Sequence, residues 1–259
     1  MSASTLHRTA SVSGMLAWRA LILVRRMPAV FIPSLIMPLF ILVATSGAFH
    51  GISAVPIGTN SYLAFTLPFA TIMGAGFAGI NAGMTLARDI EGGFVDRLIA
   101  SPAPRVALVA GPFTAAAMRS LFTTTIVLIA GAIGGLTPPG VLGTIVIYFL
   151  AAGFAMATAC WSMGVALRAR TVQSAPLMQL VVFVMVFTSV AYAPRALQTG
   201  WLRQVSNWNP VTRVLEASRG AQFESLVWAG FWPALVSLGV MLLVFGAFAL
   251  HGLARLGKD

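Results

Sequence analysis

The sequence predicts an all-α polytopic membrane protein, a single transmembrane domain over residues 1–259 with six membrane-spanning helices. Of its 259 residues, 58% are hydrophobic and only 8% are charged, and the mean hydropathy is +0.91. A soluble domain usually carries about 25% charged residues. Uncharged runs that can supply helices of roughly 20 apolar residues recur along the chain. Lipid is therefore the expected surrounding of most of this protein.

The six spans follow from these runs and from the turn signals between them. The run at 120–167 is divided by the GGLTPPG segment at 134–140, which is a turn signal, so it holds two helices. The helix after the charged loop is too long for one bilayer crossing, so its span is expected to start near Phe113, after Gly111-Pro112. The predicted spans are residues 28–48, 61–86, 113–135, 141–167, 173–192 and 228–250.

Basic residues near the span ends predict the orientation of the chain. With six spans both termini lie on one side, and that side collects eleven basic residues against four on the other. Both termini are therefore expected in the cytoplasm, in a multi-pass protein of the plasma membrane. The eleven are Arg8, Arg19, Arg25, Arg26, Arg88, Arg97, Arg105, Arg168, Arg170, Arg255 and Lys258, and the four are Arg195, Arg203, Arg213 and Arg219.

Two further segments are too polar to cross the bilayer. Residues 6–26 are predicted to form an amphipathic helix in the cytoplasmic interface, with a plain extension of the first span as the alternative. Residues 193–224 contain Trp201 and Trp208, and tryptophan favours the membrane interface. They are predicted to form two short re-entrant helices in the outer leaflet, joined at the Asn209-Pro210 turn.

The loop at 88–105, RDIEGGFVDRLIASPAPR, holds three of the six acidic residues of the chain. A short helix is expected within it, stopped by Ser101-Pro102, because proline disfavours a continuing helix. Phe94, Leu98 and Ile99 stand on this helix, which is too short to be stable alone. Apolar side chains ringed by mixed charges suit docking into a protein cleft. An ordinary hydrophilic loop between two spans is the alternative.

Two motifs give the chain a resemblance to a known family. The loop fits the pattern R-x-x-E-x-G-x-x-x-R-L-x-x-[ST]-P-x-x-R, and the second motif combines Gly-Trp-Leu, N-P-[LV]-T and a short helix of mixed charge. From about Arg19 onward the chain resembles the permeases of the ABC type-2 class, the daunorubicin-resistance-like exporters. Asp96 departs from the pattern, which bears on the choice of partner. The matching residues are Arg88, Glu91, Gly93, Arg97, Leu98, Ser101, Pro102 and Arg105, then Gly200 to Leu202, Asn209 to Thr212 and Glu216 to Arg219.

The resemblance implies the membrane subunit of an ATP-driven exporter for a hydrophobic, drug- or lipid-like substrate. Two such subunits would pair, as a homodimer or with a related permease. The short helix in each loop would dock on a separate ATPase subunit that binds Mg-ATP. The implied coupling residues are Glu91, Gly93, Phe94, Asp96, Arg97, Leu98, Ser101 and Pro102, and the implied outer re-entrant motif comprises Trp201, Asn209, Pro210, Thr212 and Glu216.

The residues themselves predict no enzyme in this chain. A phosphate-binding loop of the form G-x-x-x-x-G-K-[ST] requires a lysine, and the only lysine, Lys258, is followed by the last residue. ATP is therefore expected to be hydrolysed by a separate chain, and no cofactor is expected in this one. The three histidines are too scattered for a metal site or a nucleophile–base pair. Basic residues lie at span ends rather than on one face, so nucleic-acid binding is not predicted either.

Several residues inside the spans are candidates for a substrate path or for packing. Gly76, Gly83 and their small neighbours form one face of the second span, which favours close helix packing, including packing across a permease dimer. Asn81, beside that face, suits a packing hydrogen bond or a central cavity. Arg119 either snorkels or pairs helices, or it lies on the pathway. Phe183 and Phe187 either pack or line an apolar path.

A secondary transporter that works without ATP is the alternative function. Such a transporter normally carries acidic or histidine residues inside its spans for ion coupling. The predicted spans contain no Asp or Glu, which favours the ATP-driven interpretation.

Overall fold

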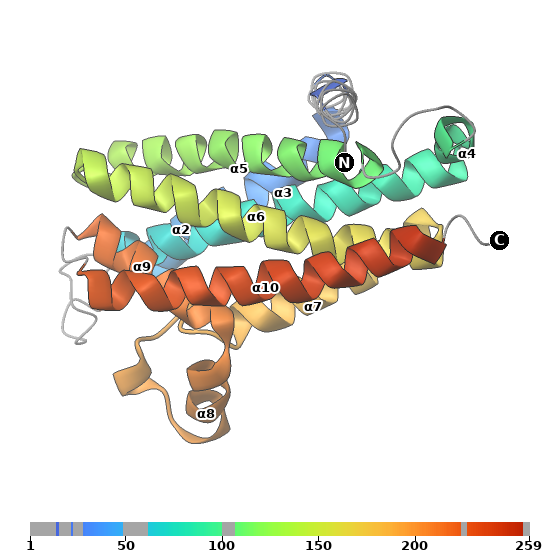
Figure 1. Ribbon diagram of the computed structural model, residues 1–259. Coiled ribbons are helices and arrows are strands. Elements are labelled where there is room, and N and C mark those ends of the chain that lie inside the picture. Colours follow the sequence, from blue (N-terminus) through green and yellow to red (C-terminus); the bar gives the residue numbers. More distant parts are fainter. Residues whose placement is uncertain are drawn as a thin grey trace.

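The computed structural model describes residues 14, 15, 22, 28–48, 62–99, 107–223 and 227–255, and within them every regular element is a helix (Figure 1). The prediction of an all-α fold is confirmed for these residues. Most of the predicted interfacial helix at 6–26 lies outside them. The elements are α2 (Pro28–Ala48), α3 (Tyr62–Glu91), α4 (Phe94–Ile99), α5 (Ala107–Ile133), α6 (Val141–Ala169), η1 (Val172–Ser174), α7 (Ala175–Phe187), η2 (Arg195–Leu197), α8 (Gly200–Trp208), α9 (Pro210–Gln222) and α10 (Trp228–Arg255).

Helix α3 is the central helix of the bundle. It packs against α2, α5, α6, α7 and α9, and its residues are buried almost without interruption from Ala64 to Gly83. Alanine and glycine make up much of this stretch, so neighbouring backbones can approach closely. Helix α10 packs on the far side of α6, and α8 stands out from the bundle, in contact mainly with α9 (Figure 1).

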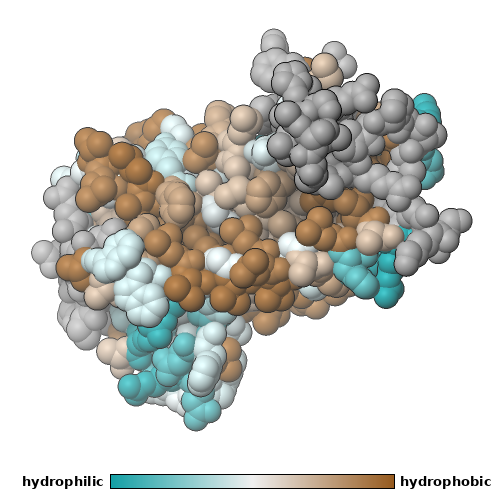
Figure 2. All heavy atoms as spheres, viewed as in Figure 1, coloured by the Kyte–Doolittle hydropathy of each residue, from teal (hydrophilic) through white to brown (hydrophobic). Residues whose placement is uncertain are grey.

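The surface carries the polarity expected of a membrane protein. Figure 2 shows hydrophobic residues in a broad band over the long helices, with hydrophilic residues gathered on α8 and at the end of the bundle that holds α4. Among the described residues, four helices are long and apolar enough to cross a bilayer: α3, α5, α6 and α10. These agree with four of the predicted spans, and the count of six stays a prediction.

Helix α5 differs from its predicted span. It begins at Ala107 and runs through Gly111-Pro112 without a break, so the helix starts six residues before the predicted span; the start of the span near Phe113 stays a prediction. The reason lies in the position of the proline. Pro112 is the sixth residue of α5, where it removes a single hydrogen bond close to an N-terminus whose first four N–H groups have no helical partner in any case.

The fifth predicted span, 173–192, contains only a short α-helix. Helix α7 has 13 residues, about 20 Å at 1.5 Å per residue, which is less than the roughly 30 Å of a hydrocarbon core. It ends at Phe187, where the hydroxyls of Thr188 and Ser189 donate to the carbonyls of Val184 and Val186. The chain beyond is irregular as far as η2.

The bundle has two ends, which position the candidate sites. The end of α3, α4, the end of α6 and the end of α10 lie together, as Glu91 contacts Thr171 and the backbone at Gly252 lies against Arg168. We call this the α4 end. The start of α3, the loop between α5 and α6, α9 and the start of α10 make up the opposite end, the α9 end (Figure 1).

Candidate functional site

At the α4 end, a two-glycine turn joins α3 to α4. The N–H of Gly92 donates to the carbonyl of Arg88 at 2.9 Å, and that of Gly93 donates to Ile90 at 3.0 Å. Gly93 has φ of 66°, a left-handed conformation that glycine adopts without a Cβ penalty. This requirement explains the glycine in the sequence motif: it ends α3 and turns the chain directly into α4.

Helix α4 is a six-residue helix held against the bundle on one side. Val95 is 1% exposed and belongs to the main core, and Leu98 packs partly buried against that core. Phe94 is half-buried, whereas Asp96 and Arg97 are exposed. The sequence pointed to Phe94 and Leu98 as docking side chains and missed Val95 as the anchor. The charged residues are the ones that α4 presents outward, and the predicted coupling residues Ser101 and Pro102 lie outside the described residues.

The side chain of Arg97 hydrogen-bonds to the turn that precedes α4. Its Nε donates to the carbonyl of Gly93 at 3.1 Å, and its Nη2 donates to that of Gly92 at 3.3 Å. The guanidinium therefore bonds two carbonyls near the end of α3, where a cation is also favoured by the helix dipole. Arg97 thus fixes the angle between α3 and α4.

Glu91, the last residue of α3, connects the α3–α4 turn, which we call the elbow, to the segment that follows α6. Its carboxylate accepts a hydrogen bond from Thr171 Oγ1 at 2.7 Å and another from the N–H of Val172 at 2.8 Å. Thr171 is the N-cap of η1, so the carboxylate bonds the N-terminus of a helical turn, a position that favours negative charge. The end of α3 is thereby bound to the start of η1, which leads directly into α7. We call this contact the Glu91 clamp.

At the α9 end, Asn209 connects α9 to the end of α7. Its Oδ1 caps α9 by accepting from the N–H of Val211 at 2.9 Å, and its Nδ2 donates to the carbonyl of Met185 and to Thr188 Oγ1. Pro210 follows as the first residue of α9, where proline is favoured because its missing N–H would have no helical partner there. Thr212 is fully buried. The Asn-Pro motif therefore starts α9 and bonds it to the end of α7.

Side chains that the sequence did not single out complete this connection. Gln198 Nε2 donates to the carbonyls of Ser189 and Ala193, and Arg219 Nη2 donates to that of Ala191 at 2.9 Å. Backbone groups in a membrane must find partners inside the protein. The irregular chain after α7 is therefore supported by side chains from Gln198 and from α9, which no local sequence signal foretold.

Helices α8 and α9 differ from each other in burial. Helix α9 is packed among α3, α6, α7 and α10, whereas Trp201, Val205 and Trp208 of α8 are 69%, 42% and 91% exposed. Their spacing of four and three residues places them on one face of α8. The prediction that this segment meets the membrane interface rests on that face, since tryptophan is enriched there.

The small residues of α3 pack within the chain. A Cβ at Gly83 would meet the backbone of Ser162 in α6, and one at Gly76 would meet Phe154 in α6 and Val182 in α7. At these two positions the predicted close packing is between helices of the same chain. Asn81 is buried, 7% exposed, on the same helix.

Arg119 lies well inside α5. It is twelve residues beyond Ala107, about 18 Å along the helix, and is 6% exposed. Its guanidinium is thus enclosed by the bundle, which disfavours snorkelling and leaves helix pairing and a place on the pathway open.

Phe183 and Phe187 belong to an aromatic cluster between α3 and α7. Their ring centroids lie 5.8 Å apart, and they also meet Phe77 and Phe69 at 5.7 and 6.2 Å. Edge-to-face and tilted pairs at these distances stabilise packing. The geometry favours the packing interpretation for both residues.

Comparison with known proteins agrees with these features. Residues 13–223 match the family described as ABC-2 type transporter. The chain is also 26% identical, over 247 residues, to the daunorubicin resistance ABC transporter permease protein DrrB1 of Streptomyces coeruleorubidus, a match that covers 93% of this chain and 85% of that protein. Most of the chain, including α4, α8 and α9, lies inside the matched region, and the chain belongs to the ABC-2 type transporter family.

Proposed function

We propose that this chain is the membrane subunit of an ATP-driven exporter, and that a separate nucleotide-binding subunit drives it by docking on the 88–105 loop. The Glu91 clamp is the observation that carries the proposal. Val95 anchors helix α4 in the main core. The central helix α3, which the two-glycine turn joins to α4, is bonded to Thr171 and Val172 at the start of η1. A displacement of α4 would therefore reach two segments of the bundle together.

The cycle proposed here is a switch between two states of the bundle. Binding of ATP to the partner subunits would favour the state in which the docked helices are drawn together, because a ligand shifts an equilibrium toward the state it binds better. The α4 end is then the cytoplasmic end and the α9 end the outer one, in a plasma membrane. A second permease, identical or related, would complete the pathway.

A hydrophobic, drug- or lipid-like cargo suits this bundle. The relative named for daunorubicin resistance supports export of a drug. Large apolar side chains are exposed on α2 and α5, among them Phe40, Val43 and Phe122, and they suit contact with lipid, with a second subunit or with an apolar cargo entering from the bilayer.

Co-purification with candidate ABC ATPase subunits tests the proposal. We expect Asp96→Arg to weaken retention of the ATPase about tenfold, since a reversed charge at an interface opposes the partner's complementary charge. Asp96 is exposed, so the fold should survive the change. Phe94→Ala and Leu98→Ala should also weaken retention, but these side chains are half-buried and report on stability as well.

The matched control is Arg203→Glu, a charge reversal at an exposed position of α8 near the other end of the bundle. It should leave retention of the ATPase unchanged. Equal retention by Asp96→Arg and by the unaltered chain would show that the loop is a spacer.

A further inference from the structure

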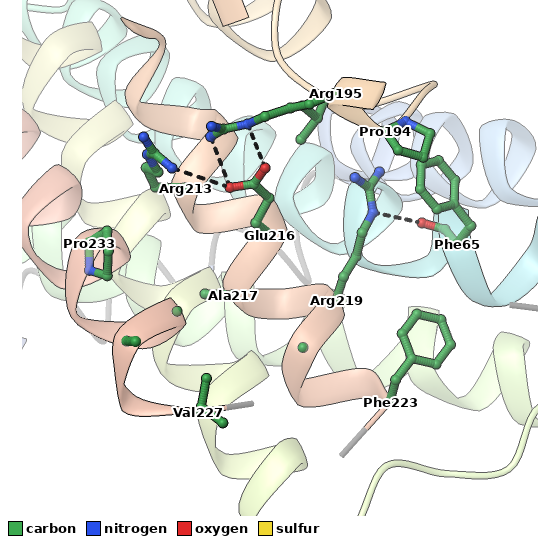
Figure 3. A pocket seen from close by; sticks show the side chains of 14 residues that line it. Phe65, Pro194, Arg195, Arg213, Glu216, Ala217, Arg219, Phe223, Val227 and Pro233 are labelled. Atoms are coloured by element: carbon green, nitrogen blue, oxygen red, sulfur yellow. Dashed lines mark hydrogen bonds and ion pairs between the residues drawn. The ribbon is translucent and has the colours of Figure 1, made fainter. Parts of the chain in front are cut away.

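A cavity of about 700 Å³ opens at the α9 end, between α9, the start of α10 and the start of α3 (Figure 3). Its volume lies within the roughly 300–1,000 Å³ range of small-molecule sites. Pro194 and Arg195 border it from the segment before α8, and Phe65 borders it from α3. The cavity is thus bounded by four parts of the chain.

One face of α9 provides the longest wall of this cavity. Arg213, Glu216, Ala217, Gly220 and Phe223 all line it, and intervals of three and four residues keep them on one side of the helix. The face changes from charged to small to aromatic along about 15 Å of helix. Such a wall offers charge at one end and apolar surface at the other.

The charged end has more arginine than carboxylate. Glu216 is the only acidic residue among the described residues that line the cavity, and it serves both Arg195, at 2.7 and 2.9 Å, and Arg213, at 3.7 Å (Figure 3). Arg195 therefore holds the carboxylate closely. Arg213 makes the longer contact, and 40% of its side chain is exposed. Its donors remain accessible to a bound anion.

Arg219 adds a further positive charge. Its Nε donates to the carbonyl of Phe65 at 3.3 Å, its Nη2 donates to that of Ala191 at 2.9 Å, and its guanidinium lies 3.7 Å from the centroid of the Phe65 ring. Carbonyls and aromatic rings orient a guanidinium without neutralising it. Burial lowers the pKa of Arg219 to about 10, still far above neutral pH. Among the described residues of the lining, three arginines thus stand against one glutamate.

We propose that this cavity binds an anionic amphiphile, with a phosphate group at Arg213 and an apolar chain along Phe223 and Val227. Arginine forks suit phosphate oxygens, and the apolar end excludes water from a hydrocarbon chain. The excess of positive charge opposes an organic cation of the same size. This site is additional to the docking of an ATPase and does not depend on it.

Calorimetric titration of the full chain in phosphatidylcholine nanodiscs tests the proposal, with empty nanodiscs as background. Three probes separate the contributions: dodecyl phosphate has both charge and chain, dodecyltrimethylammonium has the chain with the opposite charge, and inorganic phosphate has no chain. We expect saturable binding of dodecyl phosphate alone. Adding phosphatidylglycerol to the nanodisc should weaken that binding if a membrane lipid occupies the site, and should leave it unchanged if the ligand comes from solution.

Two variants localise the site. Arg213→Gln should weaken binding of dodecyl phosphate about tenfold, the loss expected for one charge-assisted contact, while the Arg195–Glu216 pair stays in place. Gly230→Leu should also weaken it, because Gly230 lines the cavity and a Cβ there would meet nothing within 4 Å. Leucine also favours the helix more than glycine does, so α10 should persist.

Arg203→Gln, at an exposed position of α8 outside the cavity, is the matched control and should bind like the unaltered chain. Equal binding of the phosphate and the ammonium probes would overturn the proposal. So would an Arg213→Gln variant that binds as well as Arg203→Gln. Because no ATPase is present, these results are independent of the test by co-purification.

Discussion

Replacing Gly79 by alanine is expected to lower the stability of the bundle by about 3 kcal/mol, the upper end of the usual cost of overpacking. The added Cβ would lie 2.6 Å from the carbonyl oxygen of Ala155 and 2.7 Å from the backbone nitrogen of Ala159, and it would overlap the hydroxyl of Thr158. Two of these atoms belong to the backbone of α6 and cannot rotate away. The two helices would have to separate.

This separation would affect more than one contact. Ser162 Oγ of α6 donates to the carbonyl of Gly79 at 2.8 Å, and both groups are buried. Moving α6 away would leave buried polar groups without partners, which adds to the cost. Thermal unfolding of the purified protein in detergent measures the effect, and the yield of folded protein should fall with it.

Gly239→Ala and Gly246→Ala are the matched controls, because both glycines lie inside α10 and a Cβ on either would meet nothing within 4 Å. Alanine favours a helix over glycine by about 1 kcal/mol, so these variants should be as stable as the parent or slightly more so. A Gly79→Ala protein that melts with the controls would mean that α3 and α6 are not packed as described.

Glu91→Gln is expected to reduce ATP-driven transport about two- to thirtyfold, the range in which changes along a coupling route act, while the fold is kept. Glutamine is nearly isosteric, but its neutral amide accepts the bonds from Thr171 and Val172 less strongly than a carboxylate does. Glu91 is exposed, so the change removes little packing. The measurements are transport and ATPase activity in proteoliposomes that contain the ATPase subunit.

Thr171 gives a test from the other side of the clamp. Thr171→Ser keeps the hydroxyl that donates to Glu91 and should preserve transport, whereas Thr171→Val removes it and should resemble Glu91→Gln. ATPase activity should persist in both impaired variants, with less cargo moved per ATP. If all three variants transport as the parent does, the clamp has no part in coupling.

The long helices and the elbow could be predicted because their signals are local. Helix α2 covers the same residues as the predicted first span, and α6 and α10 start where their spans were placed. Gly93 carried its own signal, since a glycine is needed where the chain turns left-handed. The two helices α8 and α9 were also recognisable, from the Asn-Pro turn that joins them; their re-entrant place in the outer leaflet stays a prediction.

The connections between distant segments could not be predicted. Glu91 and Thr171 lie 80 residues apart, and no pattern in either neighbourhood indicates the other. Helix α7 stops early because Asn209, Gln198 and Arg219 satisfy the carbonyls near and beyond its end, so the break depends on side chains that follow it in the sequence. The cavity likewise forms only when α3, α9 and α10 meet.

A chemical cross-link from α4 to the ATPase subunit is the most direct test of the proposal that the ATPase docks on the 88–105 loop. Cys160 is the only cysteine in the sequence, so Cys160→Ala gives a background in which Asp96→Cys carries a single thiol. With a short bifunctional reagent, this variant should form a covalent adduct with the ATPase subunit, and Arg203→Cys on α8 should not. An adduct from position 203 alone, or cargo moved by the purified chain with no nucleotide-hydrolysing partner, would contradict the account.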